Sequence, residues 1–204
     1  DYDALGSLET SVGGAARRAS LIRSLKQASD NPGLVMDAGD VFTRGPLGDM
    51  NGVPDFEVMN AVPYDIMTIG NNEFRGGRGE EGLKVLLERI RQARFPVICA
   101  NIFSKSTGER IALPYSIFEL EALRVGVFGL TTQRVAGYEQ ARDLEVRDPI
   151  AVARETVAEL RKSCDFVVAL THIGYESDLE LAAAVPAIDV IMGGDSHTWL
   201  FTPP

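Results

Sequence analysis

Several residue types are scarce in this 204-residue sequence, and each scarcity excludes a class of protein. Two cysteines, Cys99 and Cys164, are too few and too far apart for a disulfide framework or a zinc knuckle, and their apolar surroundings indicate buried thiols. No apolar run reaches the roughly 18 to 20 residues that a membrane span needs. Basic residues number 20 against 29 acidic ones, and a net charge of −9 argues against a nucleic-acid footprint. We therefore expect no nucleic-acid partner and no membrane span.

The sequence instead alternates short apolar runs with amphipathic segments. The apolar runs are typical of strands buried on both faces, and they cover residues 33–40, 64–72, 95–101, 123–130, 164–172 and 188–195. Helical spacing of apolar residues covers 13–33, 80–95 and 148–164. The last of these segments begins with Asp148 as a candidate N-cap and Pro149 at the first helical position. This order predicts an α/β fold with a largely parallel sheet, in one domain over residues 1–204.

Histidine is scarce as well, and its placement is informative. The two histidines, His172 and His197, each lie just past an apolar run. Parallel strands gather the side chains that follow them at one edge of the sheet, so polar residues after the other runs should meet the histidines there. Those residues are Asp40, Asn71, Asn72, Glu73, Asn101 and Asp195.

Such a set of donors fits a site for divalent cations. A carboxylate can bridge two ions, imidazole suits first-row transition metals, and an amide oxygen completes a mixed shell. Nearby glycines allow sharp turns and close backbone approach; they are Gly39, Gly70, Gly193 and Gly194. The alternative is that each polar residue merely caps a helix or closes a turn, which is the stronger reading for any one of them alone. We assign Arg44, Glu73 and Arg75 to solvated or loop-bracing roles.

Blocks of the sequence resemble the calcineurin-like metallophosphoesterases, specifically the N-terminal metal-binding domain of the 5'-nucleotidase / UDP-sugar hydrolase branch. The blocks follow that family's order along nearly the whole chain: GGAARRASLIRSLK, DAGDVFTRGPL, EVMNAVPYDIMTIGNNEF, RFPVICANI, LRVGVFGLTT and ALTHIGYESDLELAAAVPAIDVIMGGDSHTWL. The resemblance implies a four-layered α/β/β/α sandwich, here without the family's first strand, last strands and C-terminal nucleotide-binding domain. It also implies export to the periplasm or the cell exterior.

The family's site, carried over position by position, has three departures. Leu5, Asn72 and Asp195 stand where the family has histidine. The resemblance implies that the remaining metal ligands are Asp3, Asp40, Asn71, His172 and His197, with Asp195 as an oxygen donor in place of an imidazole. One of the family's two metal positions is then a ligand short, because Leu5 has no lone pair to donate.

The other metal position keeps four donors, and their chemistry sets the expected ion. Asp40, Asn71, His172 and Asp195 form a harder and more anionic shell than the family's, which tilts the site toward Mn²⁺, Mg²⁺ or Ca²⁺ rather than Zn²⁺. We expect one or two ions in total.

Asn72 takes the place of the histidine that assists the leaving group. An amide donates a hydrogen bond but cannot hand over a proton near neutral pH, and general acid help is worth roughly 100- to 10,000-fold. We therefore expect weak or no phosphomonoester hydrolysis and a binding or scaffolding role. The alternative is an active metal-dependent phosphohydrolase acting on nucleotides or related phosphate esters. The expected partners are a phosphate ester or nucleotide, and a protein or further domain of the same polypeptide.

Overall fold

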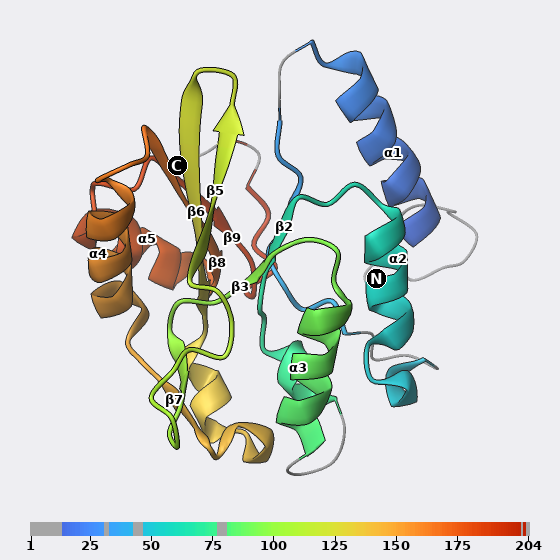
Figure 1. Cartoon of the computed structure of the whole chain (residues 1–204), viewed down its shortest axis with the longest axis vertical. Coiled ribbons are helices and arrows are strands. Elements are labelled where there is room, and N and C mark those ends of the chain that lie inside the picture. Colours follow the sequence, from blue (N-terminus) through green and yellow to red (C-terminus); the bar gives the residue numbers. More distant parts are fainter. Residues whose placement is uncertain (1–13, 31–32, 43–46, 77–80, 201, 203–204) are drawn as a thin grey trace.

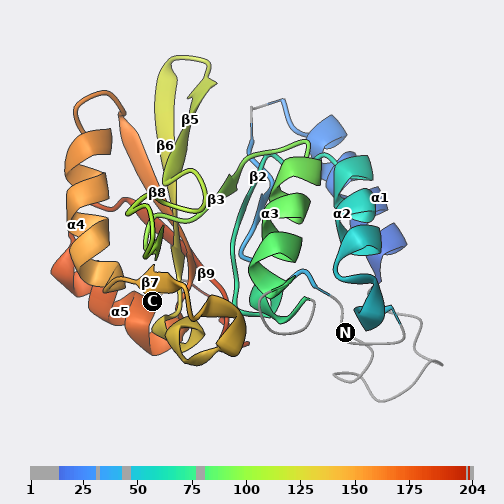
Figure 2. The same ribbon diagram turned by 60° about the horizontal axis from the view of Figure 1, so that its bottom comes forward.

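The computed structural model describes residues 14–30, 33–42, 47–76, 81–200 and 202. Its strands lie in two main sheets that face each other, and helices cover the outer side of each sheet (Figures 1 and 2). The layers therefore run helix, sheet, sheet, helix, and the predicted α/β/β/α architecture is confirmed.

The first sheet has the strand order β1-β2-β3 and is parallel throughout. Its strands are short: β1 (Met36–Asp37), β2 (Ile66–Thr68) and β3 (Val97–Ile98). Three helices lie on its outer side (Figure 2), namely α1 (Ala15–Ala28), α2 (Val53–Ala61) and α3 (Glu81–Gln92).

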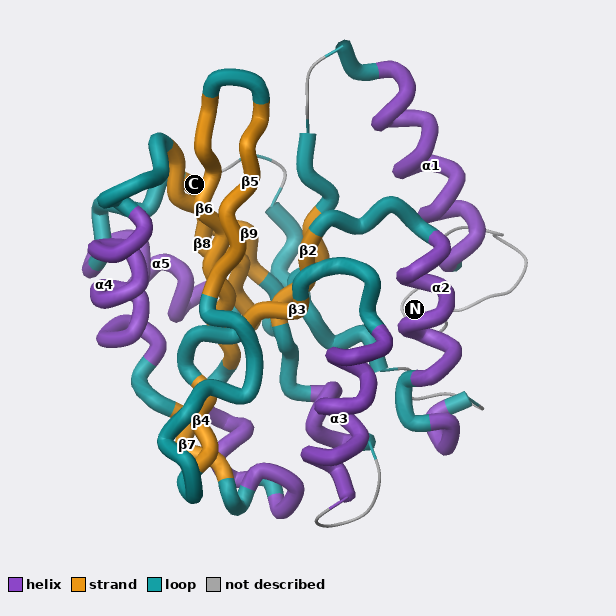
Figure 3. Tube along the Cα trace, in the orientation of Figure 1, coloured by secondary structure: helices purple, strands orange, loops and turns teal. Residues whose placement is uncertain are grey.

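The second sheet has the order β5-β6-β8-β9, in which only β5 runs antiparallel to its neighbour. Its strands are β5 (Tyr115–Leu120), β6 (Leu123–Thr131), β8 (Phe166–His172) and β9 (Val190–Gly193), and its outer helices are α4 (Pro149–Leu160) and α5 (Tyr175–Ala184). An antiparallel pair, β4 (Ile102–Ser104) and β7 (Leu144–Val146), lies apart from both sheets (Figure 3). The short 3₁₀ helices are η2 (Gly48–Met50), η3 (Asn72–Arg75), η4 (Gln133–Gly137) and η5 (Glu139–Ala141).

Burial on both faces explains why β2, β6 and β8 are mostly apolar. Along β6, Val127 packs between the two sheets while Phe128 packs under the outer helices. Along β2, Ile66 packs between the two sheets and Met67 packs on the other face, under the outer helices. Successive side chains of a strand point to opposite faces, so a strand with two covered faces has few polar positions.

The predicted helix start at Asp148 is confirmed, whereas the first predicted strand is shorter than expected. Asp148 caps α4, because its Oδ1 accepts a hydrogen bond from the Ala151 amide over 2.8 Å. The predicted run at 33–40 is strand only at β1, because Gly39 turns the chain with φ +89° and its amide bonds to Asp37. Helices α2 and α5 were not predicted from helical spacing.

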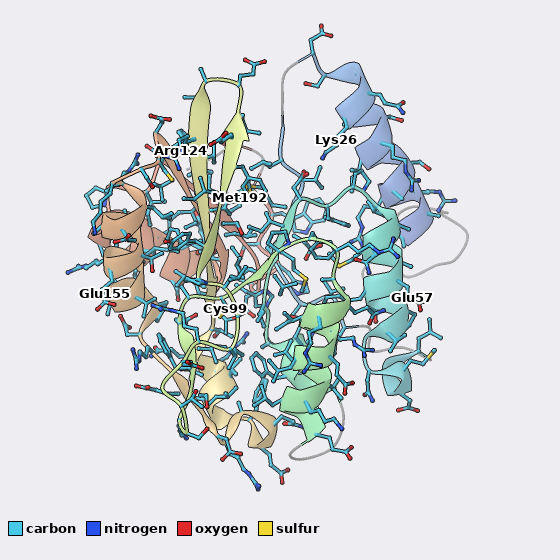
Figure 4. All side chains as sticks on the ribbon, viewed as in Figure 1. Lys26, Glu57, Cys99, Arg124, Glu155 and Met192 are labelled. Atoms are coloured by element: carbon cyan, nitrogen blue, oxygen red, sulfur yellow. The ribbon has the colours of Figure 1, made fainter. Side chains whose placement is uncertain are left out.

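Two further expectations concern the cysteines and the membrane. Both cysteines are free and buried, and burial raises the pKa of Cys99 to about 12. Figure 4 places Cys99 near the centre of the molecule, with Glu57 and Glu155 at its periphery. None of the described helices combines the length and apolar character needed to cross a bilayer.

Candidate functional site

Four of the polar residues predicted at the strand ends line one cleft of about 250 Å³. Loops and 3₁₀ helices that follow β1, β2, β6 and β9 contribute to it. Its lining residues are Asp40, Asn71, Arg75, Arg134, Tyr138, Asp195 and His197. The cleft therefore collects four of the six side chains that the sequence assigned to metal binding.

His172, at the end of β8, lies buried beside this cleft. Its Nδ1 is 2.6 Å from the carbonyl oxygen of Ala38. Because a carbonyl oxygen only accepts, Nδ1 carries the proton and Nε2 holds a lone pair in the neutral ring. Nε2 lies 3.3 Å from Asp40 Oδ1 and 3.6 Å from Asp195 Oδ1, and it has no hydrogen-bond partner among the described residues.

The environment of His172 Nε2, which has no hydrogen-bond partner among the described residues, shows whether a cation fits here. Burial lowers the pKa of His172, but the neighbouring Asp40 and Asp195 carboxylates outweigh it and the pKa is raised. The raised pKa means that the neighbouring carboxylates favour a proton on Nε2. A divalent ion held between the imidazole and the two carboxylates would take the place of that proton.

Asp40 lies just past the end of β1, where the loops that follow β1 and β2 come into close contact. A Cβ atom on Gly39 would lie 2.5 Å from the amide nitrogen of Gly70, so both loops need glycine there. Asn72 makes two hydrogen bonds to the Asp40 carboxylate: its backbone amide donates to Oδ1 over 2.7 Å, and its side-chain amide donates to Oδ2 over 2.9 Å. Asn72, which occupies the family's catalytic position, therefore orients the candidate metal ligand Asp40.

Glu73 braces the same two loops from within the protein and is not solvated. Its Oε2 accepts hydrogen bonds from the amides of Asp40 and Gly70, over 3.0 and 2.6 Å. Its Oε1 accepts from Val41 and Phe42, over 2.6 and 3.2 Å. Burial raises the pKa of Glu73 to about 7, with a further contribution from Asp40, although the amides of Asp40, Phe42 and Gly70 oppose the shift.

Arg134 and Tyr138 belong to the cleft but were missed from the sequence. Arg134 Nη2 donates to Asn71 Oδ1 over 3.3 Å and forms an ion pair with Asp195 Oδ1. Arg75 donates to the Tyr138 hydroxyl over 3.1 Å, and its guanidinium carbon lies 5.4 Å from the ring centroid. Arg134 follows the carboxyl end of β6, so the strand-end rule applied to the run at 123–130 would have found it.

The remaining predicted positions divide into three groups. Asp3, Leu5 and Arg44 lie outside the described residues. Asn101 is buried away from the cleft, where its side-chain amide donates to the Thr131 carbonyl oxygen over 2.8 Å. His197 lines the cleft.

The backbone at the cleft is unusual. Of the five described non-glycine residues with positive φ, three line the cleft: Asp40, Asp195 and His197. Such conformations persist where the surrounding structure imposes them, and they gather at functional sites. The described residues form no cluster of three or more His, Cys, Asp or Glu side chains that could hold a metal ion. The ligand assignment, which also counts the amide of Asn71, therefore stays a prediction.

Comparisons with known proteins agree on one family. The family model of the calcineurin-like phosphoesterases matches residues 11–199. A 5'-nucleotidase from Vibrio cholerae is 34% identical over 205 residues, which cover 90% of this chain and 36% of the relative. Protein UshA from Escherichia coli shows the same identity and coverage.

Solved structures with the same fold are also similar in sequence. The NAD nucleotidase of Haemophilus influenzae superposes with a TM-score of 0.82 at 31% identity, covering 94% of this chain and 38% of that one. A 5'-nucleotidase precursor from Thermus thermophilus gives 0.81 at 33% identity, covering 95% and 38%. The chain thus spans little more than a third of the length of these relatives.

Proposed function

The chain belongs to the calcineurin-like phosphoesterase family, and from this premise we propose that it binds a divalent ion and phosphate esters, nucleotides among them, but hydrolyses them weakly or not at all. Its domain is of the 5'-nucleotidase-like metallophosphoesterase type. The observation that carries the proposal is the position of Asn72. Both its amides bond to Asp40, it is 7% exposed, and it is not among the residues that line the cleft.

Four side chains would hold the ion: Asp40, Asn71, His172 and Asp195. Two ligands that are each about 2.1 Å from a shared ion lie roughly 3.0 to 3.6 Å apart. The distances from His172 Nε2 to the two carboxylate oxygens, 3.3 and 3.6 Å, fall in this range. With one imidazole and three oxygen ligands, the shell favours Mn²⁺, Mg²⁺ or Ca²⁺ over Zn²⁺. A bound ion would neutralise charge on phosphoryl oxygens.

The cleft also offers cationic groups to an anionic ligand. Arg75 and Arg134 line it, and guanidinium groups bind phosphate oxygens through paired, charge-assisted hydrogen bonds. These two residues support phosphate as the recognised group.

One observation favours the alternative of an active phosphohydrolase. His197 lines the cleft, and an imidazole can transfer a proton near neutral pH. If His197 protonates the leaving group, the chain would hydrolyse phosphate esters despite having Asn72 in place of the family's histidine.

A paired measurement separates the two functions. We expect the purified domain to retain one Mn²⁺ per chain after dialysis, measured by elemental analysis. We expect phosphate release from a nucleotide or nitrophenyl phosphate at least about 100-fold below the roughly 10 s⁻¹ typical of enzymes. Turnover near that typical rate, abolished by His197→Ala, would establish the hydrolase instead.

Replacing Asn72 by histidine tests whether the missing proton donor limits turnover. We expect Asn72→His to raise turnover by about 100-fold, because a proton donor is added at the position. Gln27→His, on the exposed side of α1, is the matched control and should leave turnover unchanged. No gain from Asn72→His would mean that something other than a missing acid limits the reaction.

Two further parts of the proposal concern the protein's surroundings. Its relatives are almost three times as long as the matched region, which supports a further domain of the same polypeptide, or a separate protein, as the partner that completes substrate binding. Family membership supports a location in the periplasm or outside the cell.

A further inference from the structure

A positive charge from the chain itself lies against the proposed metal ligands. Arg134, in η4, donates from Nη2 to Asn71 Oδ1 over 3.3 Å and pairs with Asp195 Oδ1. The Asp195 side chain is 11% exposed, whereas that of Arg134 is 61% exposed. The guanidinium therefore covers a nearly buried carboxylate from the solvent side.

Arg134 contacts the donor atoms themselves and not the far sides of the ligands. The Asp195 oxygen that it holds, Oδ1, is also the oxygen that lies 3.6 Å from His172 Nε2. The oxygen of Asn71 that it holds is the single acceptor of that side chain. A divalent ion at the proposed site would need the same two oxygen atoms, and its charge would repel the guanidinium.

We propose that Arg134 is an internal counter-cation that neutralises Asp195 in the metal-free domain and must be displaced when a divalent ion binds. The inference rests on the metal site of the proposed function. Asp40 and Asp195 each direct an oxygen at the same buried nitrogen of His172. Two carboxylates so close together need a nearby positive charge. Arg134 supplies that charge from the chain, and thereby competes with the ion.

Removing the charge of Arg134 tests the competition. We expect Arg134→Gln to bind Mn²⁺ about tenfold more tightly than wild type, within the range of roughly 5- to 150-fold that is usual for coupled sites. Arg134→Lys keeps the charge and should stay near wild type. Arg154→Gln, on the exposed side of α4, is the matched control. The readout is isothermal titration with Mn²⁺, which does not depend on turnover.

A second measurement uses the unaltered protein and does not depend on a variant folding. An arginine-specific dicarbonyl reagent modifies guanidinium groups that are free of ion pairs, and mass spectrometry locates the modified residue. We expect saturating Mn²⁺ to increase the modification rate of Arg134 several-fold and to leave that of Arg154 unchanged.

The outcomes separate this inference from the proposed function. Unchanged or weaker Mn²⁺ affinity in Arg134→Gln, or an Arg134 modification rate that Mn²⁺ does not raise, overturns the inference even if the wild type binds one ion. Absence of Mn²⁺ binding in both proteins overturns the inference together with the metal site. Tighter binding in Arg134→Gln supports the inference, whether or not either protein hydrolyses phosphate esters.

Discussion

Glu73 is a single side chain on which the geometry of the cleft depends. Each of its two oxygens accepts two backbone amides, and together the four amides belong to the loops after β1 and β2. Asp40 carries one of those amides, so the carboxylate of Glu73 helps set the backbone that presents the carboxylate of Asp40. A buried acid in this position stabilises the loops through its hydrogen bonds.

We expect Glu73→Gln to lower the free energy of unfolding by about 1 to 3 kcal/mol, because one carboxylate oxygen becomes an NH₂ group that faces two amide donors. Urea unfolding followed by circular dichroism measures the change. Glu57→Gln, on the exposed side of α2 (Figure 4), is the control and should stay within about 0.5 kcal/mol of wild type. Equal stabilities of the two variants would contradict the bracing role.

At the scale of the element, α4 shows how a local signal defines a boundary. The first turn of a helix has amides without intrahelical partners, and the Asp148 carboxylate satisfies one of them at Ala151. Its negative charge also lies at the positive end of the helix dipole. The helix then packs its buried residues, such as Val157 and Leu160, under the second sheet.

We expect Asp148→Ala to cost about 1 kcal/mol of stability, since N-cap replacements cost roughly 0.5 to 2 kcal/mol. The shift of the urea midpoint at a constant slope gives the value. Glu155→Ala, on the exposed side of the same helix, removes an acid without touching the cap and should be nearly neutral. A comparable loss in both variants would show that helix charge matters and the cap does not.

At the scale of the whole molecule, the two sheets come into close contact at Gly129 of β6. A Cβ atom there would lie 2.7 Å from Thr68 Oγ1 and 2.8 Å from the Ile98 carbonyl oxygen, both in the opposite sheet. The amide of Ala100 also donates to the carbonyl oxygen of Gly129 over 2.8 Å. The absence of a side chain thus sets how near the sheets can approach.

We expect Gly129→Ala to destabilise the protein by about 1 to 3 kcal/mol, because the methyl group must push backbone atoms apart. Gly137→Ala is the matched control: a Cβ atom there meets no atom within 4 Å, so its stability should equal or slightly exceed that of wild type. Thermal unfolding of the three proteins makes the comparison. A Gly129→Ala midpoint equal to that of wild type would show that the sheets can separate at little cost.

The site was predicted in part because its residues follow a simple rule. His172 ends a strand, Asp40 and Asp195 lie two or three residues past one, and parallel strands bring such positions to one edge. Arg134 obeys the same rule but was missed, because Thr131 at the end of its strand and Thr132 after it are not obvious metal ligands. Helix α5 was missed for a different reason: of its ten residues only Leu181 is buried, so it shows little apolar periodicity.

The sequence by itself determined three of the five described helices, most strands of the two main sheets and the edge where its chemistry gathers. Apolar runs, an N-cap and helical spacing act over a few residues, so they can be read without knowing the fold. Only the tertiary structure decided that Arg134 pairs with Asp195, 61 residues away, and that Glu73 turns inward to amides 31 to 33 residues away. Distances between remote side chains depend on how the sheets pack, and no local periodicity encodes that packing.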